Sequence, residues 1–166
     1  NILLPSGTSG TVRLVDAGLH PLLSVASTAA ADGLHTTWPF LSPEHSGFLR
    51  GGVDARSDLY SLGILAYWLV SGQVPFAADS LAALLHEHAA RSPRPLGEAA
   101  RVPPFIEEMV ARLLRKEPTD RYPSADAVLR DLDEACHRLE IGDTATTPVP
   151  SVLPPAGGTL VVGRDA

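Results

Sequence analysis

The chain of 166 residues has one cysteine, few aromatic residues and no cluster of lysine and arginine. The single thiol, Cys136, cannot form a disulfide within the chain, which fits a reducing compartment, and we expect it to pack inside a helix interface. With 13 Lys and Arg against 19 Asp and Glu, the formal net charge of −6 offers no basic surface for nucleic acid. These features predict a cytoplasmic protein that does not bind nucleic acid.

The sequence also lacks an apolar run long enough for a membrane span. The apolar stretch from Leu59 to Ala78 has no charged side chain, but Gly72 and Pro75 interrupt it after about four helical turns, and a bilayer needs ~20 apolar residues. The start of the chain has neither the basic region nor the long apolar region of a signal peptide. Because Asn1 already stands inside a strand-like pattern, we expect a longer protein to continue upstream of it.

The stretch Asp54 to Phe76 predicts a helix around which the rest of the chain is organised. Ser57 is the expected N-cap, Gly72 suits the C-terminal end, and Pro75 prevents continuation. A surface helix would show one apolar stripe, whereas this one has apolar side chains in all directions. We therefore expect it to be buried on most sides. Those side chains are Leu59, Leu62, Ile64, Leu65, Tyr67, Trp68, Leu69 and Val70.

The predicted fold is mainly α, a helical bundle around this central helix with a small β-hairpin at the N-terminal end. The hairpin joins residues 1–4 and 11–15 through a glycine-containing turn, and a rigid turn covers 38–44. Further helices are expected at 81–91, capped by Asp79 or Ser80, at 105–115, and at 125–140, capped by Ser124. Residues 141–158, rich in Thr, Pro and Gly, predict a linker, and 159–166 the start of a following domain.

Apolar residues at helical spacing predict which faces of the later helices are buried. For the helix at 105–115 these are Phe105, Met109, Leu113 and Leu114, with Glu107, Glu108 and Arg112 exposed. For the last helix they are Ala127, Val128, Leu132, Ala135, Cys136 and Leu139. The six histidines show no ligand spacing, so none is assigned to a metal.

Two oxygen-bearing residues meet at the open end of the predicted hairpin. If opposed positions sum to about 17, Asn1 lies across from Asp16. An amide oxygen and a carboxylate presented side by side suit Mg²⁺ bound together with phosphates. The alternative is that both residues are ordinary turn formers at strand ends.

A long segment of low charge follows Asp16 and is rich in Ser, Thr and Ala. Its hydroxyl residues are candidate phosphate acceptors: Ser24, Ser27, Thr28, Thr36 and Thr37. The alternative is a flexible loop without such a role, which the Ala-rich composition also fits.

The order of these pieces resembles the C-terminal lobe of a eukaryotic-like Ser/Thr protein kinase of the bacterial type. The hairpin, the Asp-x-Gly, a long loop, Ser-Pro-Glu, a helix with Asp-x-x-x-x-Gly, and a Pro-x-x-Arg turn follow one another over residues 1–140. The resemblance implies phosphoryl transfer from ATP, with Mg²⁺, to Ser or Thr hydroxyls of protein substrates.

The resemblance also implies roles for single residues. Asn1 is similar to the last residue of the His-Arg-Asp-x-x-x-x-Asn catalytic loop, and Asp16 to the aspartate of Asp-Phe-Gly; both would bind Mg²⁺ with the ATP phosphates. Thr37, seven residues before Glu44, matches the threonine that shapes the substrate hydroxyl site.

Other matching positions imply structural roles. Ser42-Pro43-Glu44 resembles the Ala-Pro-Glu that ends the activation segment, and its glutamate should pair with Arg121. Asp58 and Gly63 match the aspartate and glycine of the family's central helix, where the aspartate accepts hydrogen bonds from the catalytic-loop backbone.

Two departures keep a second function open. Ala17 stands where Asp-Phe-Gly has Phe, and Thr36 stands where a glycine usually precedes Thr37. A pseudokinase or kinase-like regulatory module, which works by binding, is therefore the alternative to an active kinase. A helical interaction domain unrelated to kinases is the third interpretation, and it predicts that Glu44 and Arg121 lie far apart.

The kinase interpretation needs partners beyond these residues. The glycine-rich loop, the strand lysine, its glutamate partner and the His-Arg-Asp aspartate would precede Asn1, in the missing N-lobe of the same domain, so the chain by itself is not expected to catalyse phosphoryl transfer. At the other end, Val161-Val162-Gly163-Arg164-Asp165 resembles the opening of an ATPase module or of a phosphopeptide-binding forkhead-associated domain. An unstructured tail is the alternative.

Overall fold

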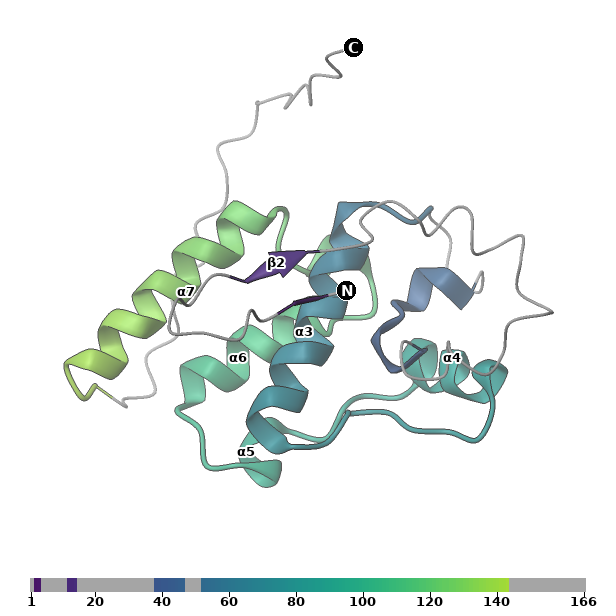
Figure 1. Cartoon of the computed structure of the whole chain (residues 1–166), viewed down its shortest axis with the longest axis horizontal. Helices are drawn as coiled ribbons and strands as arrows, with labels where there is room; N and C mark the ends of the chain where they lie inside the picture. The colour runs from purple at the N-terminus through teal and green to yellow at the C-terminus, as the bar shows by residue number, and fades with distance from the viewer. Residues whose placement is uncertain (1, 4–11, 15–37, 47–51, 144–166) are drawn as a thin grey trace, which may run out of the picture. The chain divides into compact units, whose positions relative to one another are not determined.

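The computed structural model describes residues 2–3, 12–14, 38–46 and 52–143 (Figure 1). The chain divides into two units, 1–36 and 37–166, and each is described by itself. In the first unit, strand β1 (Ile2–Leu3) pairs antiparallel with β2 (Arg13–Leu14), with Ile2 opposite Leu14 and Leu3 opposite Arg13. This register is one residue away from the expected one. The turn, and the expected pair of Asn1 and Asp16, lie outside the described residues.

Helix α3 (Ala55–Ser71) is the longest element of the second unit, and local hydrogen bonds define both of its ends. Its N-cap is Asp54, whose carboxylate accepts from the N–H of Arg56, while the Ser57 hydroxyl accepts from the N–H of Asp54. The expectation of Ser57 as N-cap was therefore wrong, because Ser57 occupies the third helical position of a capping box. Gly72 ends the helix as expected, in the left-handed conformation (φ 74°), with its N–H bonded to the carbonyl of Trp68.

Only part of the α3 surface is buried, which corrects the expectation of a helix covered on most sides. Tyr60, Ile64 and Tyr67 are at most 4% exposed. On the other side Leu62, Trp68, Leu69 and Val70 are 39–69% exposed. The physical reason is that α6 (Pro104–Leu113), α5 (Leu96–Ala99) and the 3₁₀ turn at residues 38–40 all pack on the first face. The hydrophobic core therefore lies against this face of α3.

The remaining elements follow the predicted order closely. They are the 3₁₀ turns η1 (Trp38–Phe40), η2 (Pro43–Ser46) and η3 (Pro118–Asp120), and the helices α4 (Leu81–Ala90), α5 (Leu96–Ala99), α6 (Pro104–Leu113) and α7 (Ala125–Glu140). The caps Ser80 and Ser124 are confirmed, since each side chain accepts the N–H three residues on. Helix α5 was missed because it has only four residues. A mainly α fold is confirmed for the described part of the chain.

The hydrophobic core joins α3 to the later helices. α6 lies beside α3 and carries α7 on its other side, and α4 packs on η2 (Figure 1). The predicted inward residues of α6 are all buried, while Glu107 and Arg112, expected to be exposed, are half-buried. The largest core cluster contains Tyr60, Ile64, Tyr67, Phe76, Leu84, Leu96, Val110 and Leu114. No helix among the described residues is both long and apolar enough to cross a bilayer.

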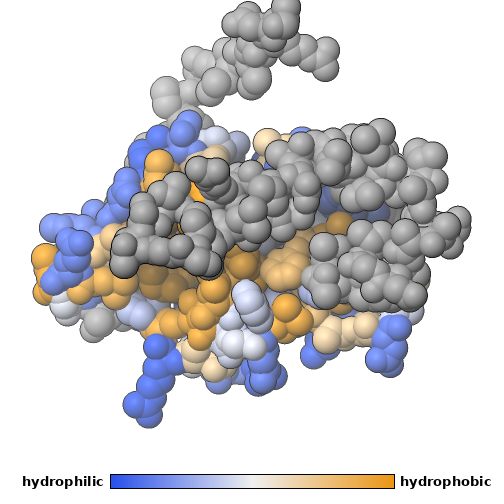
Figure 2. All heavy atoms as spheres, viewed as in Figure 1, coloured by the Kyte–Doolittle hydropathy of each residue, from blue (hydrophilic) through white to orange (hydrophobic). Residues whose placement is uncertain are grey.

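Helix α7 buries a different face from the one predicted. Ala127, Val128 and Ala135 are buried as expected, but Leu132 and Leu139 are 45% and 49% exposed. Cys136 is exposed too, so the expectation that its thiol packs inside was wrong. The buried face includes Asp131, whose carboxylate accepts a hydrogen bond of 2.8 Å from the Tyr122 hydroxyl. This bond rotates the helix about its axis so that Asp131 faces the interior. Apolar atoms accordingly appear at the surface in Figure 2, at the left where Figure 1 places α7.

Candidate active site

The segment Ser42 to Glu44 is fully buried although two of its three residues are polar. Ser42 directly precedes η2; its hydroxyl lies 2.8 Å from Nδ1 of His45, and its N–H donates to the same nitrogen. Pro43 at the start of η2 requires no N–H partner of its own. This local arrangement presents the carboxylate of Glu44, a residue only 5% exposed, to the interior.

Arg121 meets that carboxylate in a bidentate pair. Nη1 donates to Oε1 at 2.6 Å and Nη2 to Oε2 at 3.0 Å, and both side chains are at most 1% exposed. The ion pair predicted between Glu44 and Arg121 is therefore present. The interpretation as a helical domain in which the two residues lie far apart was wrong.

The guanidinium of Arg121 uses all five of its N–H donors. Besides the two bonds to Glu44, Nη1 donates to the carbonyl of Arg56, Nη2 to that of Lys116, and Nε to that of Arg115, at 2.7–2.9 Å. Its plane lies over the Tyr60 ring, 4.8 Å from the centroid. A single side chain thus connects η2, the start of α3 and the segment before η3.

Charge compensation keeps the buried carboxylate ionised. Burial alone would raise the pKa of Glu44, but the hydrogen bonds and positive charge of Arg121 hold it below its usual value. The Ser57 hydroxyl donates a further bond of 3.3 Å to Oε1. The pair is therefore charged at neutral pH and fully bonded, which is the condition under which a buried ion pair stabilises a fold.

A second polar cluster, which the sequence did not reveal, lies behind this pair. His88 of α4 is fully buried, with Nδ1 3.0 Å from the Tyr60 hydroxyl and its ring against Phe76. Lys116 donates from Nζ to the His88 carbonyl at 2.6 Å and lies 4.3 Å from the centroid of the Phe76 ring. The signal available was spacing, because His88 stands four residues after the buried Leu84 on one helix face.

The electrostatics of this cluster leave His88 neutral. Burial, assisted by the nearby charge of Lys116, lowers the pKa of His88 to about 4. Burial and Arg121 lower the pKa of Lys116 to about 8, so the lysine keeps its charge at neutral pH. Nε2 of His88 has no hydrogen-bond partner among the described residues. Acid should therefore disturb this cluster before it disturbs the rest of the core.

The residues expected to bind metal and substrate lie outside the described part of the chain. They are Asn1, Asp16 and Thr37, together with the candidate phosphate acceptors Ser24, Ser27, Thr28 and Thr36. Within residues 2–3, 12–14, 38–46 and 52–143, no group of three or more His, Cys, Asp or Glu is arranged to hold a metal ion.

Comparison with known proteins decides the family. The chain is 43% identical over 118 residues to the serine/threonine-protein kinase PksC of Streptomyces coelicolor, covering 70% of this chain and 20% of that protein. It is 35% identical over 142 residues to PknL of Mycobacterium tuberculosis, covering 85% and 35%. The chain belongs to the bacterial Ser/Thr protein kinase family.

The match to these kinases is partial. PknB of Mycolicibacterium smegmatis is 37% identical over 139 residues, which is 80% of this chain and 21% of that kinase. The chain thus spans between a fifth and about a third of the length of these three kinases. No family model matches the chain.

Asp58 and Gly63, which match the kinase family's central-helix residues, differ in their exposure. Asp58 lies in the first turn of α3 and is exposed, with no hydrogen-bond partner among the described residues. Its expected bonds to a catalytic loop stay a prediction. Gly63 is buried where α3 meets α6, and a Cβ there would lie 2.7 Å from Cβ of Leu113 and 3.0 Å from Cδ2 of Leu114.

This close approach predicts the effect of Gly63→Ala. We expect a loss of about 1–3 kcal/mol in the free energy of unfolding, because the Cβ of Leu113 is attached to the helix backbone and cannot turn away. Urea denaturation followed by circular dichroism measures it. Gly52→Ala is the control, since nothing lies within 4 Å of its Cβ position; equal unfolding midpoints for the two variants would contradict the prediction.

Proposed function

We propose that the protein is an ATP-dependent Ser/Thr protein kinase and that this chain supplies its substrate platform and two Mg²⁺ ligands. The observation that supports the proposal most strongly is the buried pair of Glu44 and Arg121. It anchors the end of the Ser42–Glu44 segment in a dry, fully bonded site, as an activation segment requires if its peptide-binding loop is to hold one conformation. Kinship with bacterial kinases implies the use of ATP and Mg²⁺.

The chemistry of the proposed ligands fits Mg²⁺. Asn1 offers an amide oxygen and Asp16 a carboxylate, both hard oxygen donors of the kind this ion prefers. Mg²⁺ with ATP would supply the phosphoryl group and offset the charge that develops on it. Asn1 and Asp16 would position those phosphates, and Thr37 would shape the site for the substrate hydroxyl.

Phosphate incorporation tests this function. A form of the protein extended upstream through the small lobe should transfer phosphate from ATP to a protein substrate, and Asp16→Ala should lower the rate about 100-fold or more through loss of a charged ligand. Asp133→Ala, at an exposed aspartate of α7, is the matched control and should keep the wild-type rate. The absence of Mg²⁺-dependent incorporation in the extended protein, or equal rates for wild type and Asp16→Ala, would refute the proposal.

One residue favours a second candidate, a pseudokinase that regulates by binding. Ala17 removes the aromatic side chain that would tie the Asp16-Ala17-Gly18 segment to the small lobe in the active state. In that case the extended protein binds ATP, measured by equilibrium titration, without transferring phosphate. The residue five positions before Asn1 discriminates as well, since an aspartate there favours the enzyme.

A further inference from the structure

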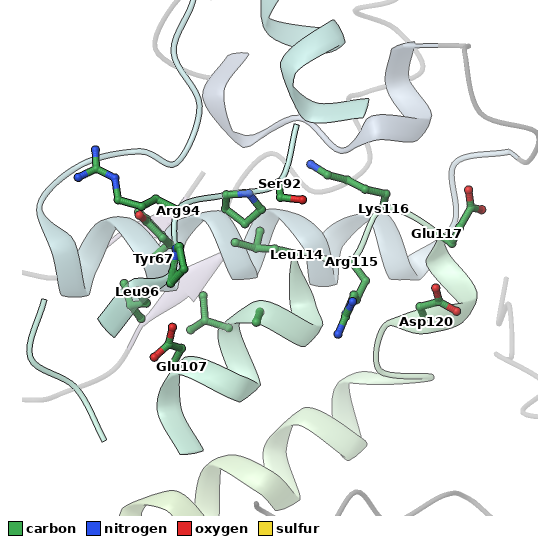
Figure 3. A pocket seen from close by; sticks show the side chains of 14 residues that line it. Tyr67, Ser92, Arg94, Leu96, Glu107, Leu114, Arg115, Lys116, Glu117 and Asp120 are labelled. Atoms are coloured by element: carbon green, nitrogen blue, oxygen red, sulfur yellow. The ribbon is translucent and has the colours of Figure 1, made fainter. Parts of the chain in front are cut away.

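A pocket of about 420 Å³ opens between α6 and the segment that joins α4 to α5 (Figure 3). Its floor is formed by Val110 and Ala111 of α6 and by Leu114 directly after that helix, and one wall by residues 92–96. One end of it holds Tyr67, Arg94, Leu96 and Glu107, and the other holds Arg115, Lys116, Glu117 and Asp120 (Figure 3). Neither the ion pair of Glu44 nor the proposed Mg²⁺ ligands contribute to this pocket.

The wall of the pocket is a proline-containing segment with unused backbone hydrogen-bonding groups. In Ser92-Pro93-Arg94-Pro95 the prolines fix φ and keep the preceding residues extended. Ser92 and Arg94 are two residues apart, so in an extended segment their N–H and C=O groups point to the same side. These groups have no partner among the described residues. The segment is thus prepared to pair with another extended backbone at little entropic cost.

One end of the pocket is built around an unpaired carboxylate. Glu107 is half-buried and has no ion-pair partner among the described residues. Its Oε2 lies 2.6 Å from the position that a Cβ of Gly97 would occupy, so the glycine of α5 makes room for the carboxylate. Glu108, the next residue of α6, is exposed and does not line the pocket.

A tyrosine side chain lines the same end of the pocket. Tyr67 is 4% exposed and lines the pocket, and no hydrogen bond involves its hydroxyl among the described residues. Burial raises the pKa of Tyr67, so the phenol stays neutral. Its oxygen can then accept a hydrogen bond from a donor. A carboxylate and a phenol oxygen at the end of an apolar floor match a side chain with an apolar stem and a cationic head.

We propose that this pocket binds an extended segment of a partner polypeptide, which pairs with Ser92 and Arg94 and places a lysine or arginine side chain against Glu107 and Tyr67. The backbone pairing supplies affinity and the cation supplies specificity. Binding of this segment does not require kinase activity.

Three peptides test the proposal on the 166-residue chain. Each is an N-acetylated, C-amidated octapeptide of alternating threonine and valine, with lysine, glutamine or glutamate at one central position. Amide shifts in NMR spectra report the binding site, and titration gives the dissociation constants. We expect the lysine peptide to shift the amides of Ser92 and Arg94 and to bind about three- to tenfold more tightly than the glutamine peptide, with the glutamate peptide weakest.

Substitutions test whether the preference for the lysine peptide comes from the carboxylate of Glu107. Glu107→Gln should remove the preference for lysine, whereas Glu108→Gln, its neighbour on the same helix, should keep it. Ala111→Arg, at an exposed position of the floor, should abolish binding of all three peptides while the circular dichroism spectrum stays unchanged. No shift at Ser92 and Arg94 with about 1 mM lysine peptide, equal binding of the three peptides, or the same response in both glutamate variants would overturn the proposal.

Discussion

Arg121→Ala should lower the free energy of unfolding by about 3–5 kcal/mol, because it leaves the buried carboxylate of Glu44 without a counter-charge. The loss extends beyond the ion pair. The carbonyls of Arg56, Arg115 and Lys116 each lose a donor that lies within 2.9 Å, and a buried acceptor without a partner costs about 1–3 kcal/mol. Some of these carbonyls will recover a bond by relaxation or from water, so the effects do not add.

Urea denaturation of the variant measures this loss. Arg130→Ala, at an exposed arginine of α7, is the matched control and should change the free energy of unfolding by less than about 0.5 kcal/mol. A loss below about 1 kcal/mol for Arg121→Ala would mean that the pair contributes no more than a surface ion pair.

A double variant separates the charge from the hydrogen bonds. Arg121→Met alone keeps the apolar stem and leaves Glu44 charged and buried, whereas Glu44→Leu combined with Arg121→Met removes both charges. We expect the double variant to be more stable than Arg121→Met, since no uncompensated charge remains, and less stable than wild type, since the three carbonyls stay unbonded. Equal stabilities for the double variant and wild type would show that these carbonyl bonds contribute little.

Acid should destabilise the fold through His88. The pKa of His88 is about 4 in the folded chain against 6.5 when exposed. Its contribution to stability is therefore complete above pH 6.5 and is lost as the pH falls toward 4, because the unfolded chain takes up the proton first. A shift of this size corresponds to about 3 kcal/mol over that interval.

The charged groups around His88 give little compensation on its protonation. Lys116 carries a positive charge beside His88. Arg121 lies over the ring of Tyr60, which is the hydrogen-bond partner of His88. Glu44 is engaged with Arg121, and Glu87 of α4, which favours the protonated form, has the smaller effect. A second cation in this cluster would meet more positive than negative charge.

Unfolding measured between pH 7 and pH 4 tests the prediction. His88→Asn keeps an acceptor for the Tyr60 hydroxyl but cannot titrate, so its stability should depend less on pH over this interval than that of wild type. His86→Asn, at an exposed histidine of the same helix, should behave as wild type does. Parallel pH profiles for wild type and His88→Asn would place the acid sensitivity elsewhere, for example at Glu44.

The pairing of Glu44 with Arg121 shows how far sequence reasoning reached at the candidate site. Two short motifs, 77 residues apart, were enough to predict the ion pair through a resemblance to a family. The three carbonyl partners of Arg121 could not be predicted, because a backbone acceptor leaves no trace in residue identity. The same holds for His88 and Lys116, whose connection runs through a carbonyl.

The sequence alone determined the four longer helices and several of their caps, since each of those caps is satisfied within about three residues of the helix end. Ser80, Ser124 and Gly72 stand where such local bonds form. Only the tertiary structure decided which faces are buried. On α7 the bond between Tyr122 and Asp131 turns a polar residue inward and leaves Leu132 exposed. The physical reason is that local hydrogen bonds depend on neighbours in the chain, whereas burial depends on contacts with distant segments, where a satisfied polar group can replace an apolar one.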